Sequence, residues 1–170
     1  KTIYLMKKYF FSITVFTLSI VSIFAQQNSN QDDIKQLIEK GIEHHDAREF
    51  EQAIEKYEEA LKIDPTSMIA TYEIALSYLA MRDYKNASKF STKVINSKDK
   101  DLIVGAYGVK SESLAEMGKV DEAIKLLEEA LRKYGDDYNL QFNLALNYFS
   151  KGDLDKTILH VDKALNLNKS

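Results

Sequence analysis

Three consecutive residues, His44, His45 and Asp46, carry side chains that often bind zinc or act as general bases. A metal site needs three or four ligands that converge on one ion, and the third histidine of the chain, His160, lies far along the sequence. The spacing therefore does not favour a metal centre, and we expect neither a metal nor another cofactor.

Two pairs of adjacent carboxylates, Asp32-Asp33 and Asp136-Asp137, are the second group suited to acid–base catalysis or calcium binding. Each pair comes directly before an expected helix, where acidic side chains cap free backbone N–H groups and complement the helix dipole. Capping explains both pairs.

Because the sequence also has no glycine-rich phosphate loop, serine nucleophile motif or zinc motif, we predict that the chain is not an enzyme and has no catalytic residue.

The composition favours helices. The 170 residues include only one Pro and six Gly, and 45% of them are hydrophobic. Few helix-breaking residues favour an all-α protein over a sheet protein, which needs many turns. The absence of cysteine excludes disulfides and a cysteine nucleophile, and a net charge of −3 without a basic run argues against a nucleic-acid partner.

Residues 1–25 are typical of a secretory signal peptide. A positive start at Met6 and two lysines leads into an uncharged apolar run over residues 9–24, which ends at the small residue Ala25. We expect translation to begin at Met6, cleavage after Ala25 and a flexible leader over residues 26–33. The mature chain would be exported by a bacterium, to the periplasm or outside the cell, without a stable membrane span. An uncleaved N-terminal anchor is the alternative.

A pattern of small and apolar residues recurs four times along the rest of the chain. Its anchors stand at intervals of 34, 36 and 34 residues. The anchors are Ala53, Ala87, Ala123 and Thr157. Upstream of each anchor an apolar helical stripe has a small residue at its centre, and these residues are Gly41, Ala75, Ser111 and Ala145. We predict four helix-turn-helix repeats, about eight helices in all, over residues 34–67, 68–101, 104–137 and 138–170.

The first repeat carries a pattern of small, small, aromatic, alanine and proline at Gly41, Ala53, Tyr57, Ala60 and Pro65. In this pattern residues 34–170 resemble the tetratricopeptide repeat (TPR) family, and the third repeat departs from it most. The resemblance implies one TPR domain folded as a right-handed α-solenoid. It also implies a non-catalytic scaffold that binds a polypeptide segment of another protein in a concave groove lined by the first helix of each repeat.

Helical spacing indicates which side chains these first helices turn toward the groove. The candidates for partner binding are Ile38, Ile42, Ile69, Tyr72, Leu76, Leu79, Gly105, Gly108, Glu112, Asn139, Phe142, Leu146 and Phe149. Most are apolar, and a contiguous exposed apolar surface usually marks an interaction site. Family members that clamp an acidic C-terminal tail use Lys, Arg and Asn at places occupied here by Ile38, Ile42 and Glu73, so we expect an apolar partner segment.

Gly105 and Gly108 share one face of the expected helix, where each glycine costs about 1 kcal/mol relative to alanine. One hypothesis is a notch between Tyr72 and Phe142 that accepts a bulky side chain of the partner. The alternative is a frayed helix start after the longer loop that precedes the third repeat.

The sequence leaves two other functions open. The chain could be the N-terminal TPR region of a longer exported protein that has an enzymatic or sensor domain downstream. It could also form a structural homo-oligomer, or contact a downstream domain, through the apolar face that Ile158, Val161 and Leu165 form on the last helix.

Overall fold

The computed structural model describes residues 30–97 and 99–168, and most of them lie in helices. The first helix includes residues 30–46. It is followed by α2 (Phe50–Ile63), α3 (Met68–Ala80), α4 (Tyr84–Ile95), α5 (Lys100–Glu116), α6 (Val120–Tyr134), α7 (Tyr138–Ser150) and α8 (Leu154–Leu167). The described residues contain no strand, so the predicted all-α class is confirmed.

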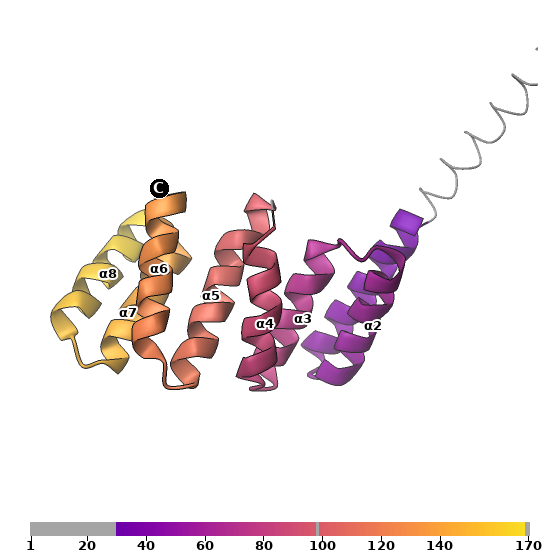
Figure 1. The fold of residues 1–170 in the computed structure, drawn as a ribbon, viewed down its shortest axis with the longest axis horizontal. Coiled ribbons are helices and arrows are strands. Elements are labelled where there is room, and N and C mark those ends of the chain that lie inside the picture. The colour runs from indigo at the N-terminus through magenta and orange to yellow at the C-terminus, as the bar shows by residue number, and fades with distance from the viewer. Residues whose placement is uncertain (1–29, 98, 169–170) are drawn as a thin grey trace, which may run out of the picture.

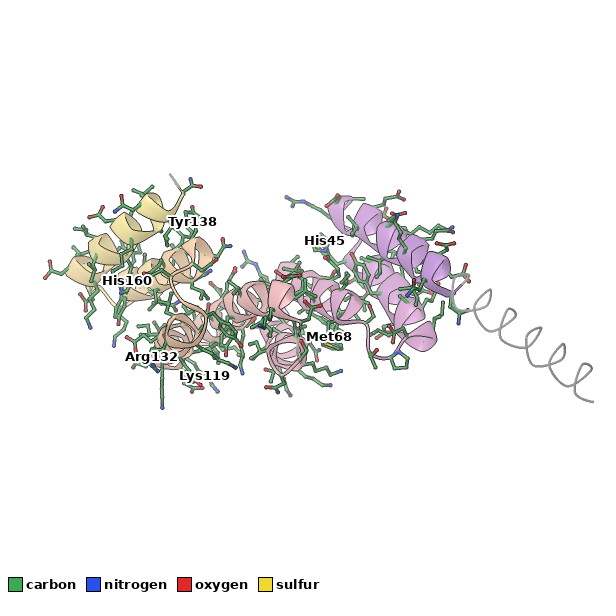
Figure 2. The ribbon with its side chains drawn as sticks, turned by 90° about the horizontal axis from the view of Figure 1, so that it is seen from above. His45, Met68, Lys119, Arg132, Tyr138 and His160 are labelled. Carbon is green, nitrogen blue, oxygen red and sulfur yellow. The ribbon has the colours of Figure 1, made fainter. Side chains whose placement is uncertain are left out.

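The helices stack in pairs as a solenoid (Figure 1). Consecutive helices pack against each other from α2 to α8, and α5 also packs against α3 and α7. The helices α3, α5 and α7 therefore form one continuous layer, and each is backed by the second helix of its repeat. Seen from above, the array is a shallow arch (Figure 2). This arrangement confirms the predicted solenoid of four helix pairs.

The helices of a repeat approach closely because they carry small residues where they cross. Ala53, Ala75 and Ala87 have no exposed surface. A methyl group added to Gly41 would overlap the ring of Tyr57, which is itself fully buried. Since protein interiors are close-packed, larger residues at these places would separate the helices. The recurring small residues are therefore a packing requirement of the repeat.

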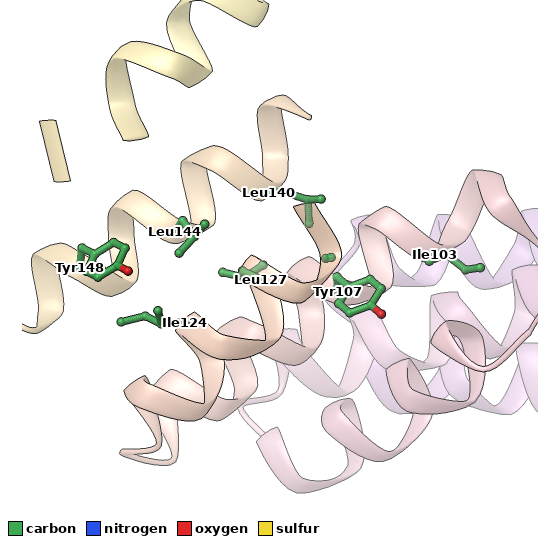
Figure 3. Packing of buried hydrophobic residues seen from close by; sticks show 8 residues of the cluster. Ile103, Tyr107, Ile124, Leu127, Leu140, Leu144 and Tyr148 are labelled. Atoms are coloured by element: carbon green, nitrogen blue, oxygen red, sulfur yellow. The ribbon is translucent and has the colours of Figure 1, made fainter. Parts of the chain in front are cut away.

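The largest apolar cluster joins the last two repeats (Figure 3). Leu127 of α6 and Leu140 and Leu144 of α7 are fully buried in it, and Tyr107 of α5 packs beside them. Burying each such leucine stabilises the fold by about 1.5–3 kcal/mol. The cluster fixes α7, which carries four of the candidate groove residues, against α5 and α6.

Short polar side chains mark the helix starts. Asp137 accepts hydrogen bonds from the backbone N–H groups of Asn139 and Leu140, at 2.8 and 3.1 Å. The capping role predicted for Asp137 is therefore confirmed. Ser67 caps α3 in the same way, accepting from the N–H of Ala70 at 3.3 Å.

The beginning of the described chain differs from two expectations. Residues 30–33 are helical, although they fall in the segment expected to be a flexible leader. Asp32 and Asp33 consequently lie inside the first helix, so the capping role predicted for this pair is wrong. An acidic residue can stand at a helix cap or inside a helix, so the residue types alone do not separate these positions. The expected signal peptide, residues 1–25, lies outside the described residues.

No helix among the described residues has both the length and the apolar character needed to cross a membrane.

The turn inside each repeat passes through one residue in the left-handed conformation. The four equivalent residues are Arg48, Arg82, Gly118 and Gly152, with φ of 63°, 61°, 78° and 78°. Glycine adopts this conformation at little cost, whereas a residue with a Cβ atom is destabilised by about 1–2 kcal/mol. The first two repeats therefore keep a strained turn that the last two relieve with glycine.

We expect Arg82→Gly to raise the free energy of unfolding by about 0.5–1 kcal/mol. Relief of the left-handed strain outweighs the extra entropy that glycine gives the unfolded chain. Urea denaturation followed by circular dichroism measures the change. The control is Arg132→Gly, which places the same substitution inside α6 and should lower stability by about 1 kcal/mol. Equal effects of the two substitutions would contradict this account of the turn.

Candidate functional site

The predicted groove residues all lie on the first helices of their repeats, and several apolar ones are exposed. Phe142, Leu146 and Phe149 of α7 have exposed fractions of 41, 49 and 63%. Ile42 of the first helix and Ile69 of α3 are also exposed. The structure thus places an apolar row along α7 and separate apolar side chains near the start of the array.

The middle of the predicted groove is less open than its ends. Tyr72, Leu76 and Leu79 are partly buried, because they pack against a cluster that includes Ala75 and Val109. These three side chains therefore stabilise the contact between α3 and α5 as well as facing the predicted groove.

The structure separates the roles of the two glycines of α5. A Cβ atom on Gly105 would lie 2.5 Å from the hydroxyl oxygen of Tyr72, so this tyrosine already fills the space beside Gly105. A Cβ atom on Gly108 would meet only the amide nitrogen of Asn143, at 3.4 Å. The expected notch is consequently closed at Gly105. Because α5 begins at Lys100, both glycines lie well inside the helix, and the frayed start considered as the alternative is also wrong.

Two clefts open between first helices of neighbouring repeats. One, of about 540 Å³, lies between the first helix and the start of α3 and is lined by Ile38 and Ile69 among others. The other, of about 300 Å³, lies between α5 and α7 and is lined by Glu112, Leu146 and Phe149. Five of the predicted candidates thus line concave sites, Ile38 and Ile69 in the first cleft and Glu112, Leu146 and Phe149 in the second.

Carboxylates lie on the same helices, and the sequence analysis already placed Glu112 among the groove candidates. Burial, together with the charge of Asp46, raises the pKa of Glu73 above its ordinary value. Burial, together with the charge of Glu116, raises the pKa of Glu112 in the same way. In the described part of the chain, no ion pair involves Asp46, Glu73 or Glu112.

The consecutive histidines have separate structural roles. His44 Nδ1 is hydrogen-bonded to the Glu49 carboxylate at 2.6 Å, and His45 Nδ1 is hydrogen-bonded to Ser77 Oγ at 3.0 Å. His45 also packs its ring edge against Phe50. Within residues 30–97 and 99–168, no group of three or more His, Cys, Asp or Glu side chains is placed to hold a metal ion.

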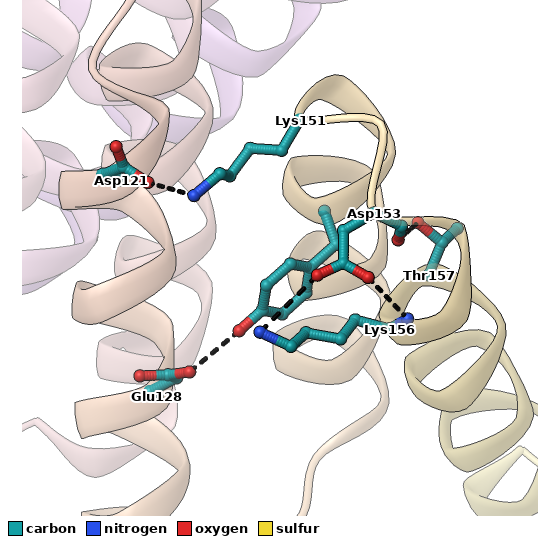
Figure 4. Close-up of polar contacts among 7 residues, drawn as sticks. Asp121, Glu128, Lys151, Asp153, Lys156 and Thr157 are labelled. Atoms are coloured by element: carbon teal, nitrogen blue, oxygen red, sulfur yellow. Dashed lines mark hydrogen bonds and ion pairs between the residues drawn. The ribbon is translucent and has the colours of Figure 1, made fainter.

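Polar contacts hold the apolar row of α7 in place from the side of α6 (Figure 4). The Tyr148 hydroxyl donates to Glu128 at 3.0 Å, and Lys151 pairs with Asp121 at 2.6 Å. Burial and the Glu128 acceptor raise the pKa of Tyr148 to about 12. Together with the buried cluster, these contacts hold α7 without using Phe142, Leu146 or Phe149, which stay exposed.

Two family models match the chain. The model described as anaphase-promoting complex, cyclosome, subunit 3 matches residues 46–130, and the model described as tetratricopeptide repeat matches residues 110–168. The TPR repeat-containing protein MJ1428 of Methanocaldococcus jannaschii is 26% identical over 118 residues, which are 69% of this chain. The chain spans 20% of the length of that relative.

Solved structures share the fold at lower identity. A thermophilic TPR protein of Thermus thermophilus, TTC0263, superposes with a TM-score of 0.69 at 21% identity, over 81% of this chain and 75% of that one. MamA from Desulfovibrio magneticus RS-1, residues 41 to the end, superposes with a TM-score of 0.66 at 19% identity, over 85% and 80% of the two chains.

The stacked pairs and their continuous layer of first helices define an α-solenoid of helix-turn-helix repeats. The chain belongs to the tetratricopeptide repeat family. Proteins of this family typically mediate contacts between proteins and are generally non-catalytic.

We expect Glu73→Gln to raise the free energy of unfolding at pH 7. The raised pKa means that the folded protein binds this proton more tightly than the unfolded chain does. The charge of Glu73 therefore lowers stability at neutral pH. This penalty disappears as the pH falls through the raised pKa of the folded protein and below the ordinary value of 4.5.

Thermal denaturation of the two proteins between pH 3 and pH 8 tests this expectation. The difference in melting temperature should be largest at neutral pH and absent at about pH 3, where the carboxyl is protonated in both states. Glu55→Gln, at an exposed position of α2, is the matched control, and at pH 7 it should change the melting temperature less than Glu73→Gln does. A destabilised Glu73→Gln protein at pH 7 would refute the assignment.

Proposed function

We propose that this chain is a non-catalytic adaptor that holds a segment of another protein against the first helices of its repeats. The observation that carries the proposal is the row of Phe142, Leu146 and Phe149, exposed on a helix that is otherwise anchored in the core. A contiguous apolar surface bordered by polar residues usually marks a protein interaction site. A concave cleft beside two of these residues supports the same function.

A random dodecapeptide library displayed on phage, selected on the purified protein, tests this function. Selected peptides should bind with a Kd that Phe149→Ser raises at least tenfold, because an exposed phenylalanine buried on binding contributes about 1.5–3 kcal/mol. Fluorescence anisotropy of labelled peptides gives the Kd. Leu159→Ser, on α8 and with 50% of its surface exposed, is the control that should leave the Kd unchanged.

A selection that yields no binding peptide, or peptides whose Kd does not change with Phe149→Ser, would refute the adaptor function at this surface.

A second candidate, a homo-oligomer, is favoured by the exposed apolar residues Leu154, Ile158 and Leu159 on α8. Light scattering of the same samples separates the two. A mass that rises with concentration, and that Ile158→Glu returns to that of one chain, would favour the homo-oligomer.

We also propose that the adaptor works outside the bacterial cytoplasm, because residues 1–25 have the composition of a signal peptide. Fused in front of an alkaline phosphatase that lacks its own signal, the chain should give phosphatase activity in whole cells, since that enzyme needs disulfides to form. Mass spectrometry of the exported product should show Gln26 as its first residue. Activity that survives replacement of Leu18 by arginine would contradict export by this segment.

A further inference from the structure

The outer helices α2 and α4 carry charges of opposite sign at equivalent positions. Counted from the buried anchors Ala53 and Ala87, the residues two before, two after and six after the anchor are all glutamates in α2 and all lysines in α4. Residues spaced by four lie on one face of a helix, so each set forms a row along its helix, with about 6 Å between neighbours. The acidic row is Glu51, Glu55 and Glu59, and the basic row is Lys85, Lys89 and Lys93.

The other second helices do not separate their charges in this way. At the same three positions α6 has an aspartate, a lysine and a glutamate, and α8 has an aspartate, a leucine and a lysine. The helix α4 also contains no acidic residue at any position. The separation by sign is therefore particular to the neighbouring helices α2 and α4.

Most of the charges in the two rows lack an opposite charge in contact. In the part of the chain that the structure describes, only Glu59 forms an ion pair, with Lys56 of its own helix at 2.9 Å. The other five side chains belong to exposed residues. Lys89 and Lys93 contact the ring of Phe90, with Nζ at 5.8 and 4.4 Å from its centroid, which orders them without neutralising their charge. Like charges four residues apart on a helix repel, so each row favours a partner of opposite charge.

The two rows do not compensate each other within one chain. The helix α3 packs against both α2 and α4, whereas α2 and α4 do not pack against each other. They run in the same direction, because each follows the turn inside its repeat (Figure 1). Equivalent residues of stacked repeats also stand at similar heights along their helices. The rows therefore lie side by side, in register, on the outer side of the first two repeats.

A second copy of the chain has the charge pattern that fits this surface. A two-fold axis that runs parallel to α2 and α4, between them, places α2 of one copy over α4 of the other. Each lysine then faces the glutamate at the equivalent position of the other chain, and symmetry makes the contact twice. An anionic membrane or a nucleic acid would be attracted by the basic row and repelled by the acidic row beside it.

We propose that two copies of this chain form a dimer through the outer faces of α2 and α4, with the basic row of each copy on the acidic row of the other. The first helices lie on the opposite side of each copy from this contact. The dimer therefore leaves both layers of first helices free, and an adaptor of this form has two partner sites that face away from each other.

The dependence of the dimer on salt is the first test. Exposed ion pairs are individually weak, so the dimer should be studied at a chain concentration on the order of 0.1 mM, by sedimentation equilibrium. Its Kd should rise at least tenfold between about 0.01 M and about 1 M NaCl, because the Debye length falls from about 30 Å to about 3 Å. Association through the apolar residues of α8 would not weaken in this way. Ile158→Glu is thus the control that should leave the salt-dependent dimer unchanged.

Reversing the charge of one row should abolish the dimer, and mixing the two reversed proteins should restore it. One protein carries Lys85→Glu, Lys89→Glu and Lys93→Glu, and the other carries Glu51→Lys, Glu55→Lys and Glu59→Lys. Each alone brings like charges together in both contacts, whereas the equimolar mixture again pairs lysine with glutamate in both. Reversing the glutamates does not increase the magnitude of the net charge of −3, so general repulsion would not explain the loss of that dimer. Lysine and glutamate have similar helix propensities, and circular dichroism checks that both proteins are folded.

Several outcomes would overturn the inference. They are a mass of one chain at low salt, a dimer that persists when either row is reversed, and a mixture of the two folded, reversed proteins that stays monomeric. Binding of a monomeric protein to phosphatidylglycerol vesicles, lost when the lysines are reversed, would assign the basic row to a membrane surface instead. The peptide selection on phage tests the adaptor function separately, so either proposal can fail without the other.

Discussion

The close crossing of paired helices is the constraint on which this structure depends. Each repeat buries an alanine or glycine where its helices meet, as with Ala87 in the second repeat and Gly41 under the ring of Tyr57. Such contact leaves no room for a longer side chain, because interiors are packed as tightly as organic crystals. Every other feature follows from that spacing: the stacking of neighbouring pairs, the continuous layer of first helices and the clefts between those helices.

The same constraint explains why the fold could be predicted from the sequence. Small residues required at crossings recur at nearly constant intervals, so the positions of Ala53, Ala87 and Ala123 are visible without coordinates. The start of α7 was predictable at Asp137, which directly precedes the helix and caps it. The helix over residues 30–46 was not predictable from Asp32 and Asp33, because an acidic residue can stand at a cap or inside a helix.

The candidate site was predictable only in part, since side-chain contacts between neighbouring helices are not encoded in helical spacing. Periodicity correctly assigned Phe142, Leu146 and Phe149 to one helix face, and all three are exposed. It gave no indication that Tyr72 fills the space beside Gly105, which depends on how α3 and α5 are placed relative to each other.

The layer of first helices differs from the outer helices in a way that bears on mechanics. Of the described helices, α5 comes within 8 Å of both α3 and α7, measured between Cα atoms, whereas α4 approaches neither α2 nor α6 so closely. The first helices thus pack against one another in a continuous layer, whereas the outer helices α2, α4 and α6 do not pack directly against one another. The packed first helices resist being pulled apart along the array, whereas the outer helices can move apart when the array bends. Bending that moves the outer helices apart therefore separates fewer directly packed helices than bending that moves the first helices apart.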